Sequence, residues 1–289
     1  MMRVYLVDGT YELFRQFFGQ PERAADDGTE VGAVYGVVTS VLGMLSGGST
    51  HLGVATDHVI ESFRNDMWPG YKSGAEVPDV LKAQFEPLEV ALDALGVMVW
   101  PMVELEADDA LASAAAVAAE DPGVDQVIIC TPDKDLAQCV VGTSVVQLDR
   151  RKDVVTDEDG VREKYGVSPH SIPDWLALVG DSADGFPGLA GWGKRSAALA
   201  LAHYGHLDAI PDEVGDWDPD LCKALRGAPK LAATLAAERE HAELFLSLAT
   251  LRIDRSLLPD VAALAWPGPT PAFEEICQHL RAPQLAERA

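Results

Sequence analysis

Short apolar runs alternate with helical patterns through the first half of the chain, and this alternation limits the possible folds more than any other sequence feature. The runs VYLV, LGVAT, VMVW, VIIC and SVVQL lie at 4–7, 52–56, 97–100, 127–130 and 144–148. Strands buried on both faces read as continuous apolar runs. The patterns between them fit helices at 11–18, 31–46, 79–95 and 107–119. Strand alternating with helix predicts an α/β domain with a mainly parallel central sheet flanked by helices.

Aspartates stand at or just beyond the ends of three of these runs. Asp8 follows the first run, Asp57 follows the second, and Asp133 and Asp135 follow the fourth. A single aspartate at such a position is common, because aspartate favours turns. In open α/β sheets, however, the ligand site lies beyond the carboxyl ends of the strands. The sequence therefore predicts an acidic cluster at one edge of the sheet.

The stretch ELEADDALASAAAVAAE, 104–120, adds Glu106, Asp108 and Asp109 in front of an alanine-rich helix. Glu106 and Asp109 would share one helix face at i, i+3, and like charges this close repel one another. The ordinary interpretation is a helix N-terminus, where acidic residues suit the helix dipole. Two more aspartates, Asp181 and Asp184, stand in GDSADG.

Taken together, these carboxylates predict a metal centre. That many carboxylates cannot all be ionised in one cleft without countercharge, and Mg²⁺ or Mn²⁺ prefers oxygen ligands. Two such ions about 4 Å apart form the usual clamp for phosphodiester cleavage. No Cys or His set has zinc spacing. The expected ligands of two or more Mg²⁺ or Mn²⁺ ions are Asp8, Asp57, Glu106, Asp108, Asp109, Asp133, Asp135, Asp181 and Asp184.

The pattern becomes helical after about residue 165, with helices expected at 171–180, 193–205, 219–227 and 229–250. We expect a catalytic α/β domain at 1–167, a small helical region at 168–257 whose glycine-rich motif would bind DNA for the reasons given next, and a C-terminal packing segment at 258–289.

The glycine-rich stretch 177–205 has the character of a helix–hairpin–helix. Gly188, Gly191 and Gly193 allow a tight turn with positive φ. A helix that begins near Lys194 offers free N–H groups to a phosphate, and Lys194 and Arg195 add charge, with Ser196 beside them. Such a hairpin binds the DNA backbone without reading bases. A purely structural turn between helices is the alternative.

The stretch FRNDMWPGYKSG, 63–74, follows the second strand and carries Arg64, Tyr71 and Lys72. A cation here can stabilise the charged transition state of a phosphate, and Tyr71 can stack on an unpaired base. The alternative is that both cations are solvated and Tyr71 is a core aromatic residue.

The formal net charge of −24 argues against a nucleic-acid partner, because phosphates demand Lys and Arg. The objection weakens if many carboxylates surround cations and basic residues form local patches. The scattered cysteines fit a reducing cytoplasm, and no apolar run reaches membrane-spanning length. The start of the chain lacks the pattern of a signal peptide. We therefore expect a cytoplasmic protein with no membrane partner.

Two other families share part of this pattern. The haloacid-dehalogenase phosphatases have a nucleophilic Asp two residues before the Asp of DGT, and this chain has Leu6 there. PIN-type ribonucleases use a similar acidic cluster, but such domains are usually shorter and lack the helical region that follows here.

The motifs together resemble the 5′-nuclease family, which comprises the 5′→3′ exonuclease domain of bacterial DNA polymerase I and stand-alone flap endonucleases. The resemblance covers about 3–257, in the family's order. The matching segments are LVDGTYELFR with Asp8 and Arg15, TDHVIESFRNDMWPGYK with Asp57, Arg64, Tyr71 and Lys72, ELEADDALA, TPDKDLAQ, GDSADGFPGLAGWGKRSA and LSLATLRID.

The resemblance implies a PIN-like 5′-nuclease fold with a helix–hairpin–helix (H3TH) subdomain and two metal sites. Asp8, Asp57, Glu106 and Asp108 would mainly serve one ion, and Asp109, Asp133, Asp135, Asp181 and Asp184 the other. Lys72 and Arg64 would contact the scissile phosphate, with Arg15 as a further catalytic candidate. The region about 60–90 would arch over single-stranded DNA, and K⁺ would bind at the hairpin.

The implied activity is 5′→3′ exonuclease and 5′-flap endonuclease cleavage in replication and repair. The substrates would be DNA with flaps, nicks, gaps or free 5′ ends, and the RNA primer of an RNA–DNA hybrid. We expect a monomer that cooperates with a DNA polymerase. Replacing Asp108 or Asp133 by Ala should abolish cleavage.

The sequence also departs from the family pattern. The arginine that commonly follows the YK pair is missing from YKSGAEVPD, Pro132 replaces a usual glycine, and Gly185 replaces a usual asparagine. None of these changes removes a carboxylate. The alternatives are a weak or inactive nuclease-like protein that binds branched DNA, and an RNase or small-molecule phosphoesterase. A protein that only binds gains nothing from so many buried negative charges.

Overall fold

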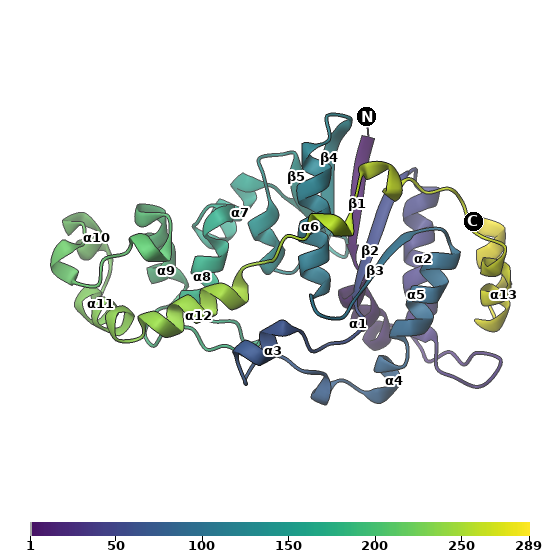
Figure 1. The fold of residues 1–289 in the computed structure, drawn as a ribbon, viewed down its shortest axis with the longest axis horizontal. Helices are drawn as coiled ribbons and strands as arrows, with labels where there is room; N and C mark the ends of the chain where they lie inside the picture. The colour runs from purple at the N-terminus through teal and green to yellow at the C-terminus, as the bar shows by residue number, and fades with distance from the viewer. Residues whose placement is uncertain (1) are drawn as a thin grey trace.

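The computed structural model describes residues 2–289, and its backbone is elongated, with a sheet-containing part and a helical part at opposite ends (Figure 1). A six-stranded sheet has the order β3-β2-β1-β4-β5-β6. All neighbouring strands are parallel except the pair β5 and β6. The strands are β1 (Met2–Asp8), β2 (His51–Asp57), β3 (Met98–Met102), β4 (Val124–Cys130), β5 (Val145–Asp149) and β6 (Val154–Thr156). The predicted α/β fold with a mainly parallel sheet is confirmed.

The strand order reverses between β1 and β4. From β1 the chain adds β2 and β3 on one side, and then crosses to place β4 on the other side of β1. At such a switch point the loops beyond the two neighbouring strands separate and leave a crevice. Asp8 ends β1, and the loop carrying Asp133 follows β4. The topology therefore brings these two acidic segments to the same crevice.

Helices cover both faces of the sheet because alternate strand residues point to opposite sides. Val7, Val54 and Ile128 pack in one core with α1 (Gly9–Gly19), α2 (Gly32–Ser46), α5 (Phe85–Ala94) and α13 (Ala272–His279). Leu6, Ala55 and Ile129 pack in a second core with the alanine-rich α6 (Ala107–Glu120). Small alanine side chains let α6 lie close to the sheet, and its first turn lies at the acidic edge.

Three local predictions were incomplete. The helix expected at 79–95 is two helices, α4 (Asp79–Lys82) and α5. Gln84 lies between them, and its Oε1 accepts hydrogen bonds from the N–H groups of Ala33 and Val34 at 3.1 and 3.3 Å in the first turn of α2. Strand β6 and helix α7 (Glu158–Tyr165) were not predicted. The β6 run is too short and too exposed to give a clear apolar pattern.

The helical region has a hydrophobic core of its own. It contains α8 (Ile172–Val179), α9 (Lys194–Tyr204), α10 (Pro219–Ala224), α11 (Ala228–Ala237) and α12 (Arg239–Ala249). A single helix was expected at 229–250, but the backbone leaves the helical region at Glu238, with φ −118° and ψ 25°. The most extensive contact between helices of this region is the one between α8 and α12.

After α12 the chain returns along α6 to the sheet (Figure 1). The Trp100 indole N–H donates to the carbonyl oxygen of Leu257 at 2.8 Å, and the N–H of Trp266 donates to the carbonyl oxygen of Thr50 at 2.8 Å. The last helix, α13, then packs beside α5. The C-terminal segment thus packs on both faces of the sheet: Val261 and Leu264 join the core with α6, and Phe273 joins the core with α5.

The segment between β2 and α5 runs along the lower edge of the molecule in Figure 1 and contains α3 (Phe63–Met67) and α4. It is fastened to the loop after α8. The Lys72 N–H donates to the carbonyl oxygen of Asp184 at 3.0 Å, and the Trp68 indole N–H donates to that of Gly185 at 3.0 Å. Gly185 has φ +81°, and a Cβ there would lie 2.0 Å from the Gly70 carbonyl oxygen, which explains a glycine at this position. No helix within residues 2–289 is long and apolar enough to cross a membrane.

Candidate active site

The site is built on the carboxyl edge of the sheet, beginning with Asp8. Asp8 ends β1 and also caps α1, since its Oδ1 accepts the Tyr11 N–H at 2.8 Å. Its Oδ2 accepts the Thr131 hydroxyl, just beyond β4, at 2.9 Å. Burial raises the pKa of Asp8 to about 7, although both hydrogen bonds act to lower it. The carboxylate is therefore fixed in position but poorly stabilised as an anion.

Asp57 is the last residue of β2, and Glu106 is the residue before α6. Asp57 Oδ1 accepts the Ala107 N–H at 2.7 Å, and burial raises the pKa of Asp57. Burial also acts to raise the pKa of Glu106, but Lys72 and Arg64 outweigh it and lower that pKa below its usual value. Glu106 thus stays charged and already has cationic partners.

Two groups of three carboxylates have oxygen atoms close enough to hold a metal ion. Asp108, Asp133 and Asp135 form one group, and Asp135, Asp181 and Asp184 form the other, with the oxygens in each group within 4.8 Å of one another. Asp135 belongs to both. The side chains come from α6, the loop after β4 and the loop after α8, so the sheet and the helical region both contribute.

The chemistry of these groups fits divalent cations. Burial and then Asp133 raise the pKa values of both Asp108 and Asp135 well above the usual range. Asp135 is 6% exposed, and its buried Oδ1 has no hydrogen-bond partner. A buried carboxylate oxygen without a donor is costly. A divalent cation that takes oxygen ligands removes this cost and the repulsion between carboxylates together.

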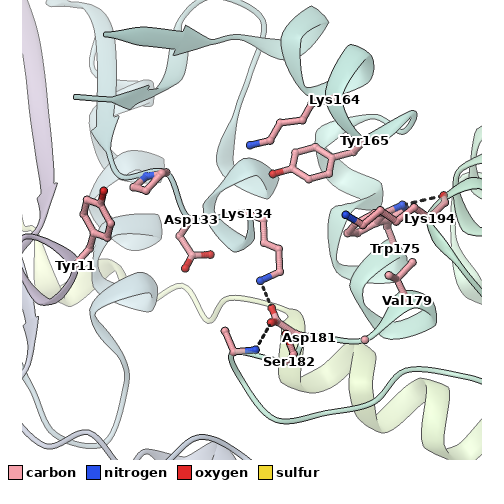
Figure 2. Close-up of a pocket in the computed structure, with 13 residues that line it drawn as sticks. Tyr11, Asp133, Lys134, Lys164, Tyr165, Trp175, Val179, Asp181, Ser182 and Lys194 are labelled. Atoms are coloured by element: carbon pink, nitrogen blue, oxygen red, sulfur yellow. Dashed lines mark hydrogen bonds and ion pairs between the residues drawn. The ribbon is translucent and has the colours of Figure 1, made fainter. Parts of the chain in front are cut away.

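Two lysines neutralise part of this charge. Lys72 Nζ lies 2.9 Å from Glu106 Oε2 and 3.3 Å from Asp184 Oδ1. Lys134 Nζ forms an ion pair with Asp181 Oδ2, on the wall of a cavity of about 580 Å³ (Figure 2). Sequence reasoning missed Lys134, although its place between Asp133 and Asp135 was a signal.

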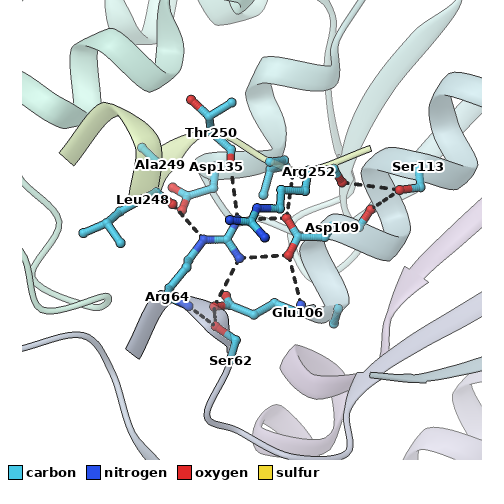
Figure 3. A network of polar contacts seen from close by, with 12 residues as sticks. Ser62, Arg64, Glu106, Asp109, Ser113, Asp135, Leu248, Ala249, Thr250 and Arg252 are labelled. Carbon is cyan, nitrogen blue, oxygen red and sulfur yellow. Dashed lines mark hydrogen bonds and ion pairs between the residues drawn. The ribbon is translucent and has the colours of Figure 1, made fainter. Parts of the chain in front are cut away.

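Arg64 and Asp109 do not join the carboxylate groups. The Arg64 guanidinium donates to both carboxylate oxygens of Asp109 at 2.8 Å and to the Leu248 carbonyl oxygen at 2.8 Å (Figure 3). Asp109 also accepts the Glu106 and Arg252 N–H groups at 3.0 and 2.8 Å. Arg64 is 1% exposed and Asp109 is 0% exposed. The expected phosphate contact and metal ligand are instead a buried pair, because the first turn of α6 points Asp108 and Asp109 to different sides.

Two other predicted residues have partners inside the protein. Tyr71 is 5% exposed, and its hydroxyl donates to Glu106 Oε2 at 3.2 Å, so it is a core residue and not a free stacking surface. Arg15 donates to Glu12 Oε2 at 2.5 Å and lines a separate cavity with Arg151. None of the residues of the two carboxylate groups lines the cavity at which Arg15 lies.

The glycine-rich stretch forms the expected turn between α8 and α9. Gly188 has φ +67°, and a Cβ there would lie 2.3 Å from the Gly180 nitrogen; Gly191 has φ +88°. Gly193 caps α9, and its N–H donates to Ser196 Oγ at 2.9 Å. Lys194 and Arg195 are exposed in the first turn. The cavity of Figure 2 connects this turn to the carboxylates, with Lys134, Lys164 and Lys194 on its walls.

The protein combines an α/β sheet, an acidic cluster whose chemistry suits divalent cations, and a helical hairpin, a combination typical of proteins that act on phosphodiesters. Family models identify the particular family. A model of the 5'-3' exonuclease N-terminal resolvase-like domain matches residues 3–166, and one of the 5'-3' exonuclease C-terminal SAM fold matches residues 167–272. The chain belongs to the 5'-3' exonuclease family, as the motifs predicted.

Curated relatives agree with this assignment. DNA polymerase I of Pseudomonas aeruginosa is 34% identical over 275 residues, which cover 91% of this chain and 28% of the polymerase. The 5'-3' exonuclease of Aquifex aeolicus is 30% identical over 256 residues, which cover 88% of this chain and 83% of that protein. The chain thus spans less than a third of the polymerase but most of the exonuclease.

Solved structures share the fold. The T5 D15 protein co-crystallised with metal ions has a TM-score of 0.66 and 19% identity, over 99% of both chains. The catalytic core of Rad2 in complex with DNA substrate has a TM-score of 0.64 and 15% identity, over 99% of this chain and 90% of that one.

Proposed function

We propose that this protein is a divalent-metal-dependent 5′→3′ exonuclease and 5′-flap endonuclease that hydrolyses DNA phosphodiesters in replication and repair. One observation carries the proposal: two groups of three carboxylates share Asp135, whose buried Oδ1 has no donor. Two Mg²⁺ or Mn²⁺ ions bound there would supply an activated water and stabilise the charge that develops on the phosphate. Asp108, Asp133, Asp135, Asp181 and Asp184 would hold them.

Residues around the two groups would position the substrate. Asp8 and Asp57, at the ends of adjacent strands, would orient water or outer-sphere ligands through the remaining lone pairs of their carboxylate oxygens. Lys72 lies between Glu106 and Asp184 and is 28% exposed on its side chain, so its ammonium can also reach a phosphate oxygen. Arg64 and Asp109 would act indirectly, by fixing Glu106 and the first turn of α6.

The hairpin would hold the DNA backbone. The first N–H groups of α9, with Lys194 and Arg195, offer a sequence-independent phosphate site. The three lysines along the cavity between hairpin and carboxylates give a local positive path in a chain whose net charge is −24. Double-stranded DNA beside a 5′ flap, nick, gap or free end is the proposed partner, and an RNA primer strand fits the same backbone contacts. We also propose K⁺ at the hairpin, a monomer, and cooperation with a DNA polymerase.

The test is cleavage of a 5′-labelled flap duplex and a 5′-labelled nicked duplex in Mg²⁺ or Mn²⁺ at moderate salt, with Asp133→Ala as the control. We expect cleavage near the junction that the substitution abolishes. Tight binding without cleavage in either metal would favour a nuclease-like protein that only binds branched DNA. Activity retained in Asp133→Ala would contradict the assignment of the site.

A further inference from the structure

Two histidine side chains meet at the ends of α8 and α9 that lie away from the glycine-rich turn. His170 stands two residues before α8, and His206 stands two residues after α9. Their ring centroids are 5.1 Å apart, and the planes of the two rings are inclined by 47°. Both residues are exposed to solvent. An ion in solution can therefore reach both imidazole rings.

A buried carboxylate orients the ring of His206. Asp174, in the first turn of α8, is 3% exposed, and its Oδ2 lies 3.0 Å from Nδ1 of His206. Its Oδ1 accepts the Leu207 N–H at 2.8 Å. Within residues 2–289, no Lys or Arg forms an ion pair with this carboxylate. Because an ionised carboxylate only accepts hydrogen bonds, Nδ1 of His206 is the donor, and the lone pair of the neutral ring is on Nε2.

His170 has a matching arrangement. Its Nε2 lies 3.0 Å from the hydroxyl oxygen of Ser168, which lies 3.1 Å from that of Ser171. Ser168 can accept from His170 and donate to Ser171, and the lone pair of the neutral His170 ring is then on Nδ1. Neither His170 Nδ1 nor His206 Nε2 has a hydrogen-bond partner in the part of the chain that the structure describes. Each ring thus has one nitrogen held by the protein and one that is open to a ligand.

This arrangement is the usual one for imidazole ligands of a transition metal ion. Metal-binding histidines donate their other ring N–H to a carboxylate or another acceptor, which fixes the ring and makes it a better ligand. Zn²⁺ binds an imidazole nitrogen at about 2.0–2.1 Å, so two imidazoles on one tetrahedral ion have centroids about 5.2 Å apart. The distance of 5.1 Å between His170 and His206 agrees with this geometry.

We propose that His170 and His206 bind a transition metal ion of the Zn²⁺ type, with water completing its coordination. Imidazole nitrogen suits Zn²⁺, Cu²⁺ and Ni²⁺, whereas the carboxylate groups of the candidate active site suit Mg²⁺ or Mn²⁺. The ion links the start of α8 to the end of α9, so it fastens the open end of the hairpin. This site goes beyond the proposed nuclease function and does not depend on it.

The first experiment is titration calorimetry with Zn²⁺ in excess Mg²⁺, which occupies the carboxylate groups. We expect the wild type to bind a Zn²⁺ ion that is lost in His170→Gln and in His206→Gln. Asp135→Asn, which alters both carboxylate groups, should keep this ion. His241→Gln, at an exposed histidine of α12, is the matched control and should also keep it. Unchanged Zn²⁺ binding in His170→Gln and His206→Gln, or its loss in Asp135→Asn alone, would overturn the inference.

Co²⁺ identifies the ligand atoms. Tetrahedral Co²⁺ with imidazole ligands absorbs visible light far more strongly than octahedral Co²⁺ with oxygen ligands, because coordination geometry follows ligand type. We expect a visible band in the wild type and in Asp135→Asn, and its loss in His206→Gln. A band of equal strength in His206→Gln would contradict coordination by this pair.

Asp174→Asn tests the positioning of His206. Asparagine can still accept the Leu207 N–H, but it removes the negative charge beside Nδ1. We expect Zn²⁺ affinity to fall roughly 10- to 100-fold, as on loss of a hydrogen-bond partner of a metal ligand. Unchanged affinity would exclude a role for Asp174 in the site.

Hydrogen exchange tests whether the ion fastens the hairpin. An ion that binds only the folded state slows the opening of the segments it links. Zn²⁺ should slow the exchange of amides in α8 and α9 of the wild type and of His241→Gln, but not of His206→Gln. Equal slowing in His206→Gln, or none in the wild type at saturating Zn²⁺, would overturn the inference.

Discussion

Asp108 and Asp109 are neighbours in the chain, yet they belong to two opposite kinds of charged region. Asp108 faces Asp133 and Asp135, and burial with these neighbours raises its pKa well above the usual range. Asp109 is fully buried but accepts both arms of the Arg64 guanidinium and two backbone N–H groups. The carboxylates around Asp108 repel one another, whereas the Asp109 carboxylate is neutralised by Arg64 and fully hydrogen-bonded.

The difference shows how a folded chain separates function from stability. Carboxylates left unsatisfied near a surface cleft reduce stability until a cation binds, whereas a saturated buried pair fixes geometry and offers no vacant coordination. Arg64, on α3, hydrogen-bonds to Asp109 on α6 and to the Leu248 carbonyl oxygen at the end of α12 (Figure 3). These contacts fix the position of the helical region relative to the sheet next to the carboxylates. Neutralising a carboxylate of the first region should therefore abolish activity and raise the stability of the metal-free protein. Neutralising one partner of the buried pair should instead lower stability.

The largest expected effect comes from Asp135→Asn, because Asp135 belongs to both carboxylate groups. We expect a loss of cleavage on the order of 100-fold or more, and a metal-free unfolding temperature that rises by roughly 2 °C or more as repulsion is removed. Cleavage rates in Mg²⁺ measure the loss of activity, and thermal unfolding curves in EDTA measure the change in stability. Asp220→Asn, a change of the same kind at an exposed position of α10, should alter neither. A lower metal-free unfolding temperature for Asp135→Asn than for the wild type would show that Asp135 does not belong to a region of unrelieved charge repulsion.

Arg64→Met should act through stability first. Removing one partner of a buried pair leaves the other charge uncompensated, so we expect the free energy of unfolding to fall by about 3–5 kcal/mol. The double variant Arg64→Met/Asp109→Leu should recover much of this loss, because the Asp109 charge is removed as well and Glu106 keeps Lys72 as its partner. Denaturant unfolding of the wild type, both single variants and the double variant tests this. Additive losses in the double variant would show that the two residues are not a pair.

The metal-free protein should lose stability as the pH rises. Asp8 has a pKa of about 7 in the folded protein against 3.8 ordinarily, so the folded state binds more protons than the unfolded state across this interval. The stabilising contribution is complete below about pH 4 and is lost as the pH approaches 7. We expect a decrease on the order of a few kcal/mol, to which Asp108 and Asp135 add in the same direction.

Divalent cations provide the control for that pH dependence. With saturating Mg²⁺ the carboxylates stay ionised in the folded state, and stability should no longer fall between pH 5 and 7. Thermal unfolding across this interval with and without Mg²⁺ gives the comparison. The same downward slope in both conditions would show that these carboxylates do not bind the ion.

The smallest effect is expected at the hairpin. Lys194→Gln should weaken DNA binding several-fold and reduce the slope of log Kd against log salt by about 1, as loss of one phosphate contact requires. Lys223→Gln, at an exposed lysine of α10, is the matched control and should leave the slope unchanged. Equal slopes for both variants and the wild type would exclude a phosphate contact at Lys194.

Much of the sheet and its acidic edge could be predicted from local pattern. Buried parallel strands require continuous apolar runs, and the aspartates at their ends follow directly in the sequence. The short, exposed strand β6 and the interrupted helices at Gln84 and Glu238 could not be predicted in this way. Gln84, which lies between α4 and α5, hydrogen-bonds to the first turn of α2, and a contact between segments so far apart in the chain leaves no local pattern.

The sequence by itself determined the fold class, the family and which carboxylates could gather at one edge, because these depend on periodicity and on short motifs. The tertiary structure alone decided which neighbour in EADD became a candidate ligand and which became a buried partner. It also buried Tyr71. These outcomes depend on the direction of each side chain from its helix and on the distant groups it meets, such as Arg64 and the Leu248 carbonyl oxygen. No local pattern contains that information.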